Sequence, residues 1–112
     1  MKILVVDDDF ETRESIKNML TGQRVNVIYT SDTGSALLKL KDNEDIETVI
    51  TDYRLPGLSG KDWISILRHF YPNMHIIVIS GYDIVENILQ NEGLKIIKKP
   101  FKQYQLLDAI GL

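Results

Sequence analysis

Residues 49–60 read VITDYRLPGLSG, and this stretch decides how the rest of the chain is organised. It begins as a short run of apolar, β-branched residues, ends that run on a single carboxylate, Asp52, and continues into a loop with one proline and two glycines. This pattern is typical of a buried strand followed by a tight loop. We therefore expect the carboxylate of Asp52 at the rim of a sheet, as a helix cap, a ligand or a nucleophile.

Length and composition restrict the class of protein. A chain of 112 residues fits one domain, residues 1–112, with a single core. The net charge of −3 gives no positive field that would attract nucleic acid or an anionic membrane surface. Because no apolar run approaches about 18 residues and Met1-Lys2 leads directly into a strand, we expect no membrane span and no signal peptide. The absence of cysteine excludes disulfides and thiol catalysis and fits a cytoplasmic location.

Strand and helix patterns alternate along the chain. Apolar strands are predicted at residues 3–6, 25–29, 48–51, 75–79 and 95–97. A helix with one apolar face is predicted after each strand, the fourth around residues 84–89. These faces are expected to place Phe10, Leu38, Trp63 and Phe70 in the core. Parallel neighbours require crossovers, so five strand–helix units predict an α/β fold, a doubly wound parallel sheet covered by helices on both faces.

The carboxyl ends of the predicted strands carry polar residues, and these ends meet at one rim. Asp7-Asp8-Asp9 ends the first strand, Asp52 the third and Ser80 the fourth, and Lys99 follows the fifth. Two carboxylates about 5 Å apart repel by roughly 3 kcal/mol at an effective dielectric of about 20. A hard divalent cation removes this repulsion, and Mg²⁺ tolerates a site that leaves it several waters. With an ammonium and a hydroxyl beside it, Asp52 is a candidate nucleophile that accepts a phosphoryl group.

Four segments carry a resemblance to a known family. They read ILVVDD at residues 3–8, TDYRLPGLSG at 51–60, IVISG at 77–81 and KKPF at 98–101. In this order, at the ends of four strands, they resemble the receiver domain of bacterial two-component response regulators over essentially the whole chain. The resemblance implies a flavodoxin-like (βα)5 fold with strand order 2-1-3-4-5.

The resemblance also implies a metal-dependent phosphoacceptor site. Asp52 would take a phosphoryl group from the phosphohistidine of a sensor histidine kinase or phosphotransfer protein, or from a small phosphodonor. Mg²⁺, or alternatively Mn²⁺, would be held by Asp8 and Asp52 directly and by Asp7 through water. The main-chain carbonyl of Arg54 would complete the protein ligands.

Further implications concern the phosphoryl group and the partners. Lys99 and Ser80 would contact the phosphoryl group, and the peptide bond between Lys99 and Pro100 is expected to be cis. The chain would be a signalling domain that assists its own phosphorylation and dephosphorylation, not an enzyme. It would switch a surface that binds a downstream protein, without binding nucleic acid or a membrane itself.

The same residues have structural interpretations. Asp7-Asp8-Asp9 could cap the first helix, although one cap needs only one acid. Asp52 could be a turn residue before the Pro-Gly loop, Ser80-Gly81 a turn, and Lys98-Lys99 a solvated pair. The two histidines, His69 and His75, are expected away from the rim.

Three other functions compete with phosphoacceptance. The Asp-x-Asp of residues 7–9 resembles the nucleophile loop of haloacid dehalogenase-like phosphatases, but Glu11 stands where those proteins have Thr or Val. A flavodoxin-like electron carrier would need a loop rich in Ser, Thr and Gly after the first strand, and three acids would repel a flavin phosphate. A receiver-shaped interaction module that is not phosphorylated remains the main alternative. It predicts a lost acid or a lost lysine, and all are present.

Two departures from the family pattern bear on the switch. Ile96 stands where the family usually has Tyr or Phe, and Gly81 replaces the commoner Ala. The span from Ser80 to Lys99 is also short for the family. These departures leave the phosphorylation chemistry in place, and we expect an altered output surface between the fourth and fifth helices.

Overall fold

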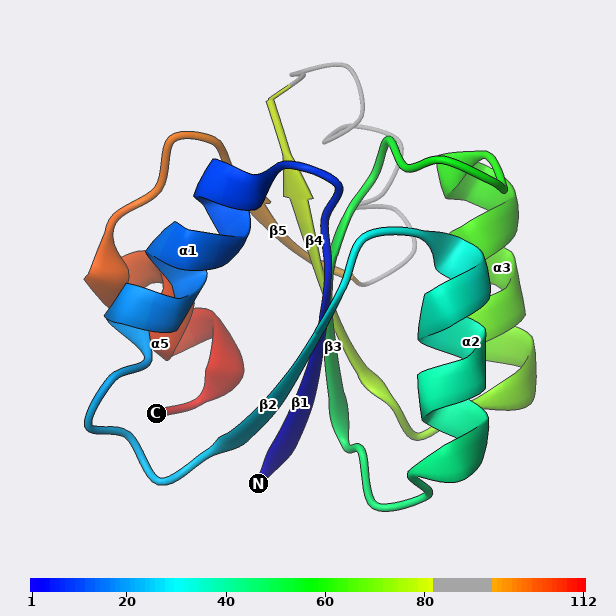
Figure 1. Cartoon of the computed structure of the whole chain (residues 1–112), viewed down its shortest axis with the longest axis horizontal. Helices are drawn as coiled ribbons and strands as arrows, with labels where there is room; N and C mark the ends of the chain where they lie inside the picture. The colour runs from blue at the N-terminus through cyan, green and yellow to red at the C-terminus, as the bar shows by residue number, and fades with distance from the viewer. Residues whose placement is uncertain (82–93) are drawn as a thin grey trace.

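The computed structural model describes residues 1–81 and 94–112. Within them, five parallel strands form one sheet in the order β2-β1-β3-β4-β5 (Figure 1). The strands are β1 (Lys2–Val6), β2 (Asn26–Thr30), β3 (Thr48–Asp52), β4 (His75–Ser80) and β5 (Lys95–Lys98). The helices are α1 (Phe10–Met19), α2 (Thr33–Asp42), α3 (Gly60–Phe70) and α5 (Gln103–Ile110). The predicted fold class and strand order are confirmed.

Helices cover both faces of the sheet, α1 and α5 on one side and α2 and α3 on the other (Figure 1). Two apolar clusters result, because successive strand residues point to opposite faces. In β1, Ile3 and Val5 pack with α1 and α5, whereas Leu4 and Val6 pack with α2 and α3. The central strands β1, β3 and β4 are therefore buried almost throughout, as their runs of apolar and β-branched residues predict. The more polar β2 lies at a sheet edge and is largely half-buried, also as predicted.

Each predicted strand is present, and no bound differs from its prediction by more than one residue. The predicted fourth helix, around residues 84–89, lies outside the described residues. None of the described helices is long and apolar enough to cross a membrane.

Three residues predicted to lie in the core are exposed, and two of them are at helix ends. Phe10, the first residue of α1, is 64% exposed and lies under the guanidinium of Arg13, 5.8 Å from ring centroid to Cζ. Phe70, the last residue of α3, is 68% exposed and stacks edge-to-face on His69. Leu38 lies on the outer side of α2, 63% exposed.

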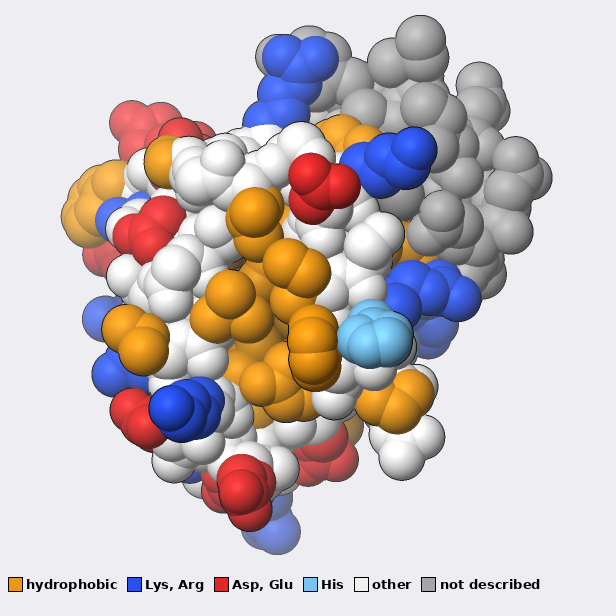
Figure 2. All heavy atoms as spheres, turned by 90° about the vertical axis from the view of Figure 1, so that its right-hand side faces the viewer, with side chains coloured by type: hydrophobic (Ala, Val, Ile, Leu, Met, Phe, Trp, Pro, Cys, Tyr) orange, Lys and Arg blue, Asp and Glu red, His pale blue; other side chains and the backbone are white. Residues whose placement is uncertain are grey.

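The buried face of α3 explains the error at Phe70. Its buried residues are Gly60, Trp63, Ile64 and Leu67, so the predicted spacing of i, i+3, i+4 and i+7 is right but begins three residues earlier. Trp63 is fully buried, as predicted. Figure 2 shows the side of the molecule where α2 and α3 lie, and apolar atoms form a surface patch there.

Candidate functional site

The polar residues of the rim meet at the carboxyl edge of the sheet. Asp7 and Asp8 follow β1, Asp52 is the last residue of β3, Ser80 is the last of β4, and Lys99 follows β5. One carboxylate oxygen from each of Asp7, Asp8 and Asp52 lies within 4.8 Å of the other two. The cluster arises because parallel strands end at the same edge.

Lys99 is the cation of this cluster. Its Nζ lies 2.8 Å from Oδ2 of Asp52, to which it donates a hydrogen bond, and 3.0 Å from Oδ2 of Asp7. Burial acts to lower the pKa of Lys99, but the hydrogen bond to Asp52 and the negative charges of Asp52 and Asp7 outweigh burial and raise that pKa. Lys99 therefore stays protonated at neutral pH.

The backbone places Lys99 firmly. Its N–H donates to the carbonyl oxygen of Ser80 at 2.8 Å, which joins the ends of β4 and β5. The peptide bond between Lys99 and Pro100 is cis, as expected. The buried side chain of Ser80 lies at the end of β4, one register position beyond the pair formed by Asp52 and Ile79.

Asp7 is fully buried, an unusual position for a carboxylate. Its Oδ1 accepts a hydrogen bond from the backbone of Asp9 at 2.9 Å. Its Oδ2 faces Lys99 without a well-directed hydrogen bond and has no other hydrogen-bond partner among the described residues. Burial raises the pKa of Asp7, while the Asp9 amide and Lys99 act to lower it. This buried oxygen has unused hydrogen-bonding capacity and lies beside two further carboxylates. Together these oxygen atoms form a set of ligands that suits a hard cation.

The three consecutive acids have three different environments. Asp7 is buried, Asp8 is exposed, and Asp9 is the N-cap of α1. The carboxylate of Asp9 accepts hydrogen bonds from Glu11 N and the hydroxyl of Thr12, at 3.2 and 2.8 Å. The bond from Thr12 is the main reason that the pKa of Asp9 is lowered. The capping interpretation therefore holds for Asp9, which leaves Asp7 and Asp8 for the acidic cluster.

The loop between β3 and α3 is held in one shape by close contacts. The amide of Arg54 donates to Oδ1 of Asp52 at 3.2 Å. Gly57 has a φ of +106°, a conformation that favours glycine. A Cβ on Gly60 would collide with the carbonyl oxygen and the ring of Tyr53. These contacts order the segment that carries the main-chain carbonyl of Arg54.

Several contacts around the site carry no sequence signal. Arg13 donates from Nη1 to the carbonyl oxygen of Asp7 at 2.7 Å and so holds the end of β1. The hydroxyl of Thr33, at the start of α2, accepts from the amide of Leu58 at 3.3 Å. Thr51 and Trp63 are hydrogen-bonded to each other beneath Asp52. Only the folded chain brings these partners together, since their sequence separations follow no local rule.

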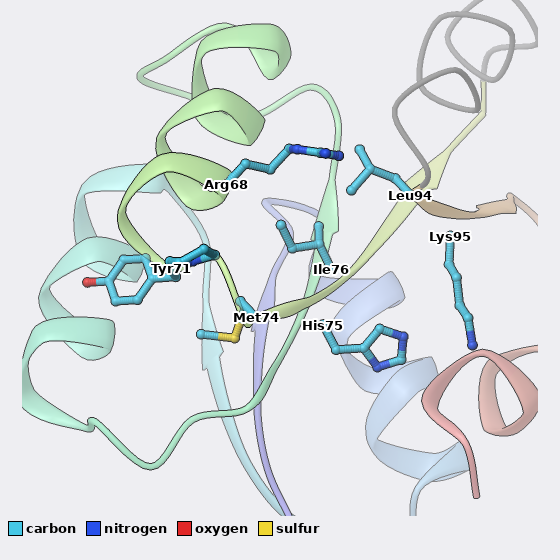
Figure 3. Close-up of a pocket in the computed structure, with 8 residues that line it drawn as sticks. Arg68, Tyr71, Met74, His75, Ile76, Leu94 and Lys95 are labelled. Carbon is cyan, nitrogen blue, oxygen red and sulfur yellow. The ribbon is translucent and has the colours of Figure 1, made fainter.

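A cavity of about 440 Å³ lies at the other end of the sheet (Figure 3). It is lined by the end of α3 and the starts of β4 and β5, where Arg68, Ile76 and Leu94 turn toward one another. His75 also lines it, and burial together with the charge of Lys95 lowers the pKa of His75. None of the acidic cluster lines this cavity. As predicted, His75 lies away from the rim.

Known proteins resemble this chain over nearly its whole length. The family model described as the response regulator receiver domain matches residues 3–111. The transcriptional regulatory protein HptR of Staphylococcus aureus is 30% identical over 98% of the chain and 45% of its own length. The chain spans between 23% and 48% of the curated relatives named HoxA, HptR, FleR and CtrA.

Solved structures share the fold. A receiver domain from Clostridium thermocellum has a TM-score of 0.87 and 31% identity, and the match covers 98% of this chain and 90% of that one. The CheX–CheY–BeF3–Mg²⁺ complex from Borrelia burgdorferi contains a match with a TM-score of 0.85 and 26% identity, over 98% and 86% of the two chains.

Proposed function

The chain belongs to the response regulator receiver domain family, and on that premise we propose that Asp52 is its phosphoacceptor. The phosphoryl donor would be the phosphohistidine of a sensor histidine kinase or phosphotransfer protein, or a small phosphodonor. The observation that carries the proposal is the position of Asp52 between two further carboxylates and the ammonium of Lys99.

In the proposed reaction Asp52 is the nucleophile. One of its carboxylate oxygens forms the new bond to phosphorus as the bond from phosphorus to the donor nitrogen breaks, and the released imidazole takes up a proton from solvent. The amide of Arg54 and the ammonium of Lys99 fix the carboxylate, one on each oxygen. After transfer, Lys99 is placed to pair with the phosphoryl oxygens, and the hydroxyl of Ser80 can donate a further hydrogen bond.

Asp7, Asp8 and Asp52, with the main-chain carbonyl of Arg54, would hold Mg²⁺, and Mn²⁺ is the alternative ion. When bound, the ion supplies positive charge that offsets the carboxylates and the phosphoryl oxygens. The under-satisfied oxygen of Asp7 and the all-oxygen donor set support this assignment. Asp8, the exposed member, leaves the cluster open to solvent on one side.

The product of this chemistry would be a signal. We propose a signalling domain that promotes its own phosphorylation and dephosphorylation and acts on a downstream protein in the cytoplasm. A receiver-like module that is never phosphorylated is the competing function, and the intact set of acids and lysine argues against it.

Intact mass after incubation with Mg²⁺ and acetyl phosphate tests the proposal. We expect one phosphoryl adduct on the wild-type chain, none on Asp52→Asn, and strongly reduced labelling of Lys99→Ala and Asp8→Ala. Asp42→Asn, an exposed acid at the end of α2, is the matched control and should label normally. Full labelling of Asp52→Asn, or labelling that survives a chelator, would contradict the proposed function.

A further inference from the structure

Two buried side chains connect α3 to the phosphoacceptor strand. The indole Nε1 of Trp63 donates to Oγ1 of Thr51 at 2.9 Å, and that hydroxyl donates to the carbonyl oxygen of Asp52, also at 2.9 Å. Both side chains are fully buried. The result is a two-step hydrogen-bonded relay that ends on the main chain of Asp52.

The direction of the relay follows from the donor chemistry. An indole N–H is a donor only, so the Thr51 oxygen must accept from Trp63. The single hydroxyl proton is then available for the carbonyl of Asp52, which can only accept. Each bond polarises the next, and exclusion of water strengthens both.

We propose that Thr51 and Trp63 are positioning residues for Asp52, an inference that rests on the proposed role of Asp52. The carbonyl of Asp52 belongs to the peptide plane between Asp52 and Tyr53. A donor on that oxygen therefore fixes both the direction in which Asp52 leaves β3 and the start of the loop that follows.

The relay also joins the two ends of that loop. Thr51 lies on β3, before the loop, and Trp63 lies on the first turn of α3, after it. The backbone N–H of Trp63 donates to the carbonyl of Ser59 at 2.9 Å, so Trp63 is fixed to the helix start as well. A change at the acidic cluster and a shift of α3 are thus coupled through one buried indole, the only tryptophan of the chain.

A purely structural role for the pair must be distinguished from positioning. Thr51→Val keeps the shape of the side chain but leaves the indole N–H buried without its acceptor, so either role predicts a loss of stability. In the double variant Thr51→Val/Trp63→Phe both partners are apolar, and much of the stability should return. The donor to the Asp52 carbonyl is missing in the single variant and in the double variant alike.

The experiment compares four variants with the wild type: Thr51→Val, Trp63→Phe, the double variant and Thr51→Ser. The melting temperature, the Mg²⁺ dissociation constant from the metal dependence of that temperature, and the rate of phosphorylation by acetyl phosphate at saturating Mg²⁺ are measured for each. We expect the rate of Thr51→Val to fall about three- to tenfold, the range that the loss of one hydrogen bond implies. The double variant should regain stability but not rate, Trp63→Phe should fall in between, and Thr51→Ser should behave like the wild type.

Two outcomes would overturn the inference. One is a rate for Thr51→Val within twofold of the wild type, and the other is a double variant that regains its rate together with its stability. If the wild type itself is not labelled, the proposed function fails, and the relay is judged on Mg²⁺ binding. Weaker binding in both Thr51→Val and the double variant would then support positioning, and unchanged binding would refute it.

Discussion

Replacing Lys99 with methionine should destabilise the metal-free protein through the charges it leaves behind. Methionine keeps an unbranched stem of similar length but removes the ammonium that lies 3.0 and 2.8 Å from the carboxylates of Asp7 and Asp52. The side chain of Asp7 is fully buried and that of Asp52 is 15% exposed, so neither charge is well solvated once Lys99 is gone.

The size of the effect follows from the geometry. The carboxylate oxygens of Asp7 and Asp52 lie within 4.8 Å of each other, and two charges at about that distance repel by roughly 3 kcal/mol at an effective dielectric of about 20. Removing one partner from a buried pair typically costs about 3–5 kcal/mol. Lys99 is 25% exposed, so solvent already screens part of its interaction. We therefore expect a loss of about 2–3 kcal/mol in the free energy of unfolding, or roughly 8–12 °C in melting temperature.

The pH dependence of the variant follows from Asp7. Burial raises the pKa of Asp7 above its ordinary value of 3.8, and Lys99 opposes that rise, so its removal should raise the pKa further. A carboxyl group whose pKa is higher in the folded state than in the unfolded state stabilises the fold when it is protonated. This stabilisation is complete at pH values below the unfolded-state pKa and is lost as pH rises through the folded-state pKa. The loss in free energy of unfolding caused by Lys99→Met should therefore be largest at neutral pH and shrink as pH falls toward the ordinary pKa of aspartate.

Urea unfolding with a chelator present, at pH 7 and at pH 5, measures this prediction. The double variant Asp7→Asn/Lys99→Met should be more stable than Lys99→Met alone, because it no longer carries the buried carboxylate. Lys61→Met, an exposed lysine of α3, is the control and should change little. A loss below about 1 kcal/mol for Lys99→Met, or no recovery in the double variant, would refute the electrostatic reasoning.

Three further predictions concern the metal, the loop and the switch. Asp8→Asn should raise the metal-free melting temperature only slightly, because Asp8 is exposed. The same variant should lose the stabilisation of about 1.4 kcal/mol that Mg²⁺ is expected to give at ten times its dissociation constant. An undiminished stabilisation by Mg²⁺ would show that Asp8 is not a ligand. Gly60→Ala should lower the free energy of unfolding, measured with urea, by about 1–3 kcal/mol, because the Tyr53 carbonyl cannot move aside freely. The control Gly34→Ala, in α2, should leave the free energy of unfolding unchanged or raise it. Beryllofluoride should shift backbone amide NMR signals more at residues 53–60 than at 94–97 and 104–107, since Ile96 lacks the ring that gives two discrete packings; equal shifts would contradict this.

Much of the fold and the composition of the site follow from local rules. Runs of apolar and β-branched residues mark the buried central strands, and the more alternating run marks the edge strand β2. Once the strands are known to be parallel, the residues that follow them must gather at one edge. The grouping of Asp7, Asp8, Asp52 and Lys99 is therefore a consequence of topology that the sequence alone predicts.

The phase of a helix face is harder to predict than its period. In α3 the spacing of apolar residues is right, but the buried face starts at Gly60, because the ring and carbonyl of Tyr53 pack against that position and leave no room for a Cβ. Phe70, the last residue of α3, then falls outside the buried face and is exposed. The contacts of Arg13 and Trp63 were not predictable either, because each depends on where another element places its partner.

The three consecutive aspartates show that the fold gives identical side chains different environments. Three aspartates follow β1, yet one is buried, one is exposed and one is bound to the start of α1. The cap removes Asp9 from the cluster, and Asp52 from β3 takes the third place. With all three carboxylates of the cluster ionised and Lys99 protonated, two negative charges remain uncompensated at the edge of the sheet. One divalent cation would balance this charge. Burial raises the pKa of Asp7, so holding that carboxylate ionised inside the protein is costly unless positive charge lies beside it.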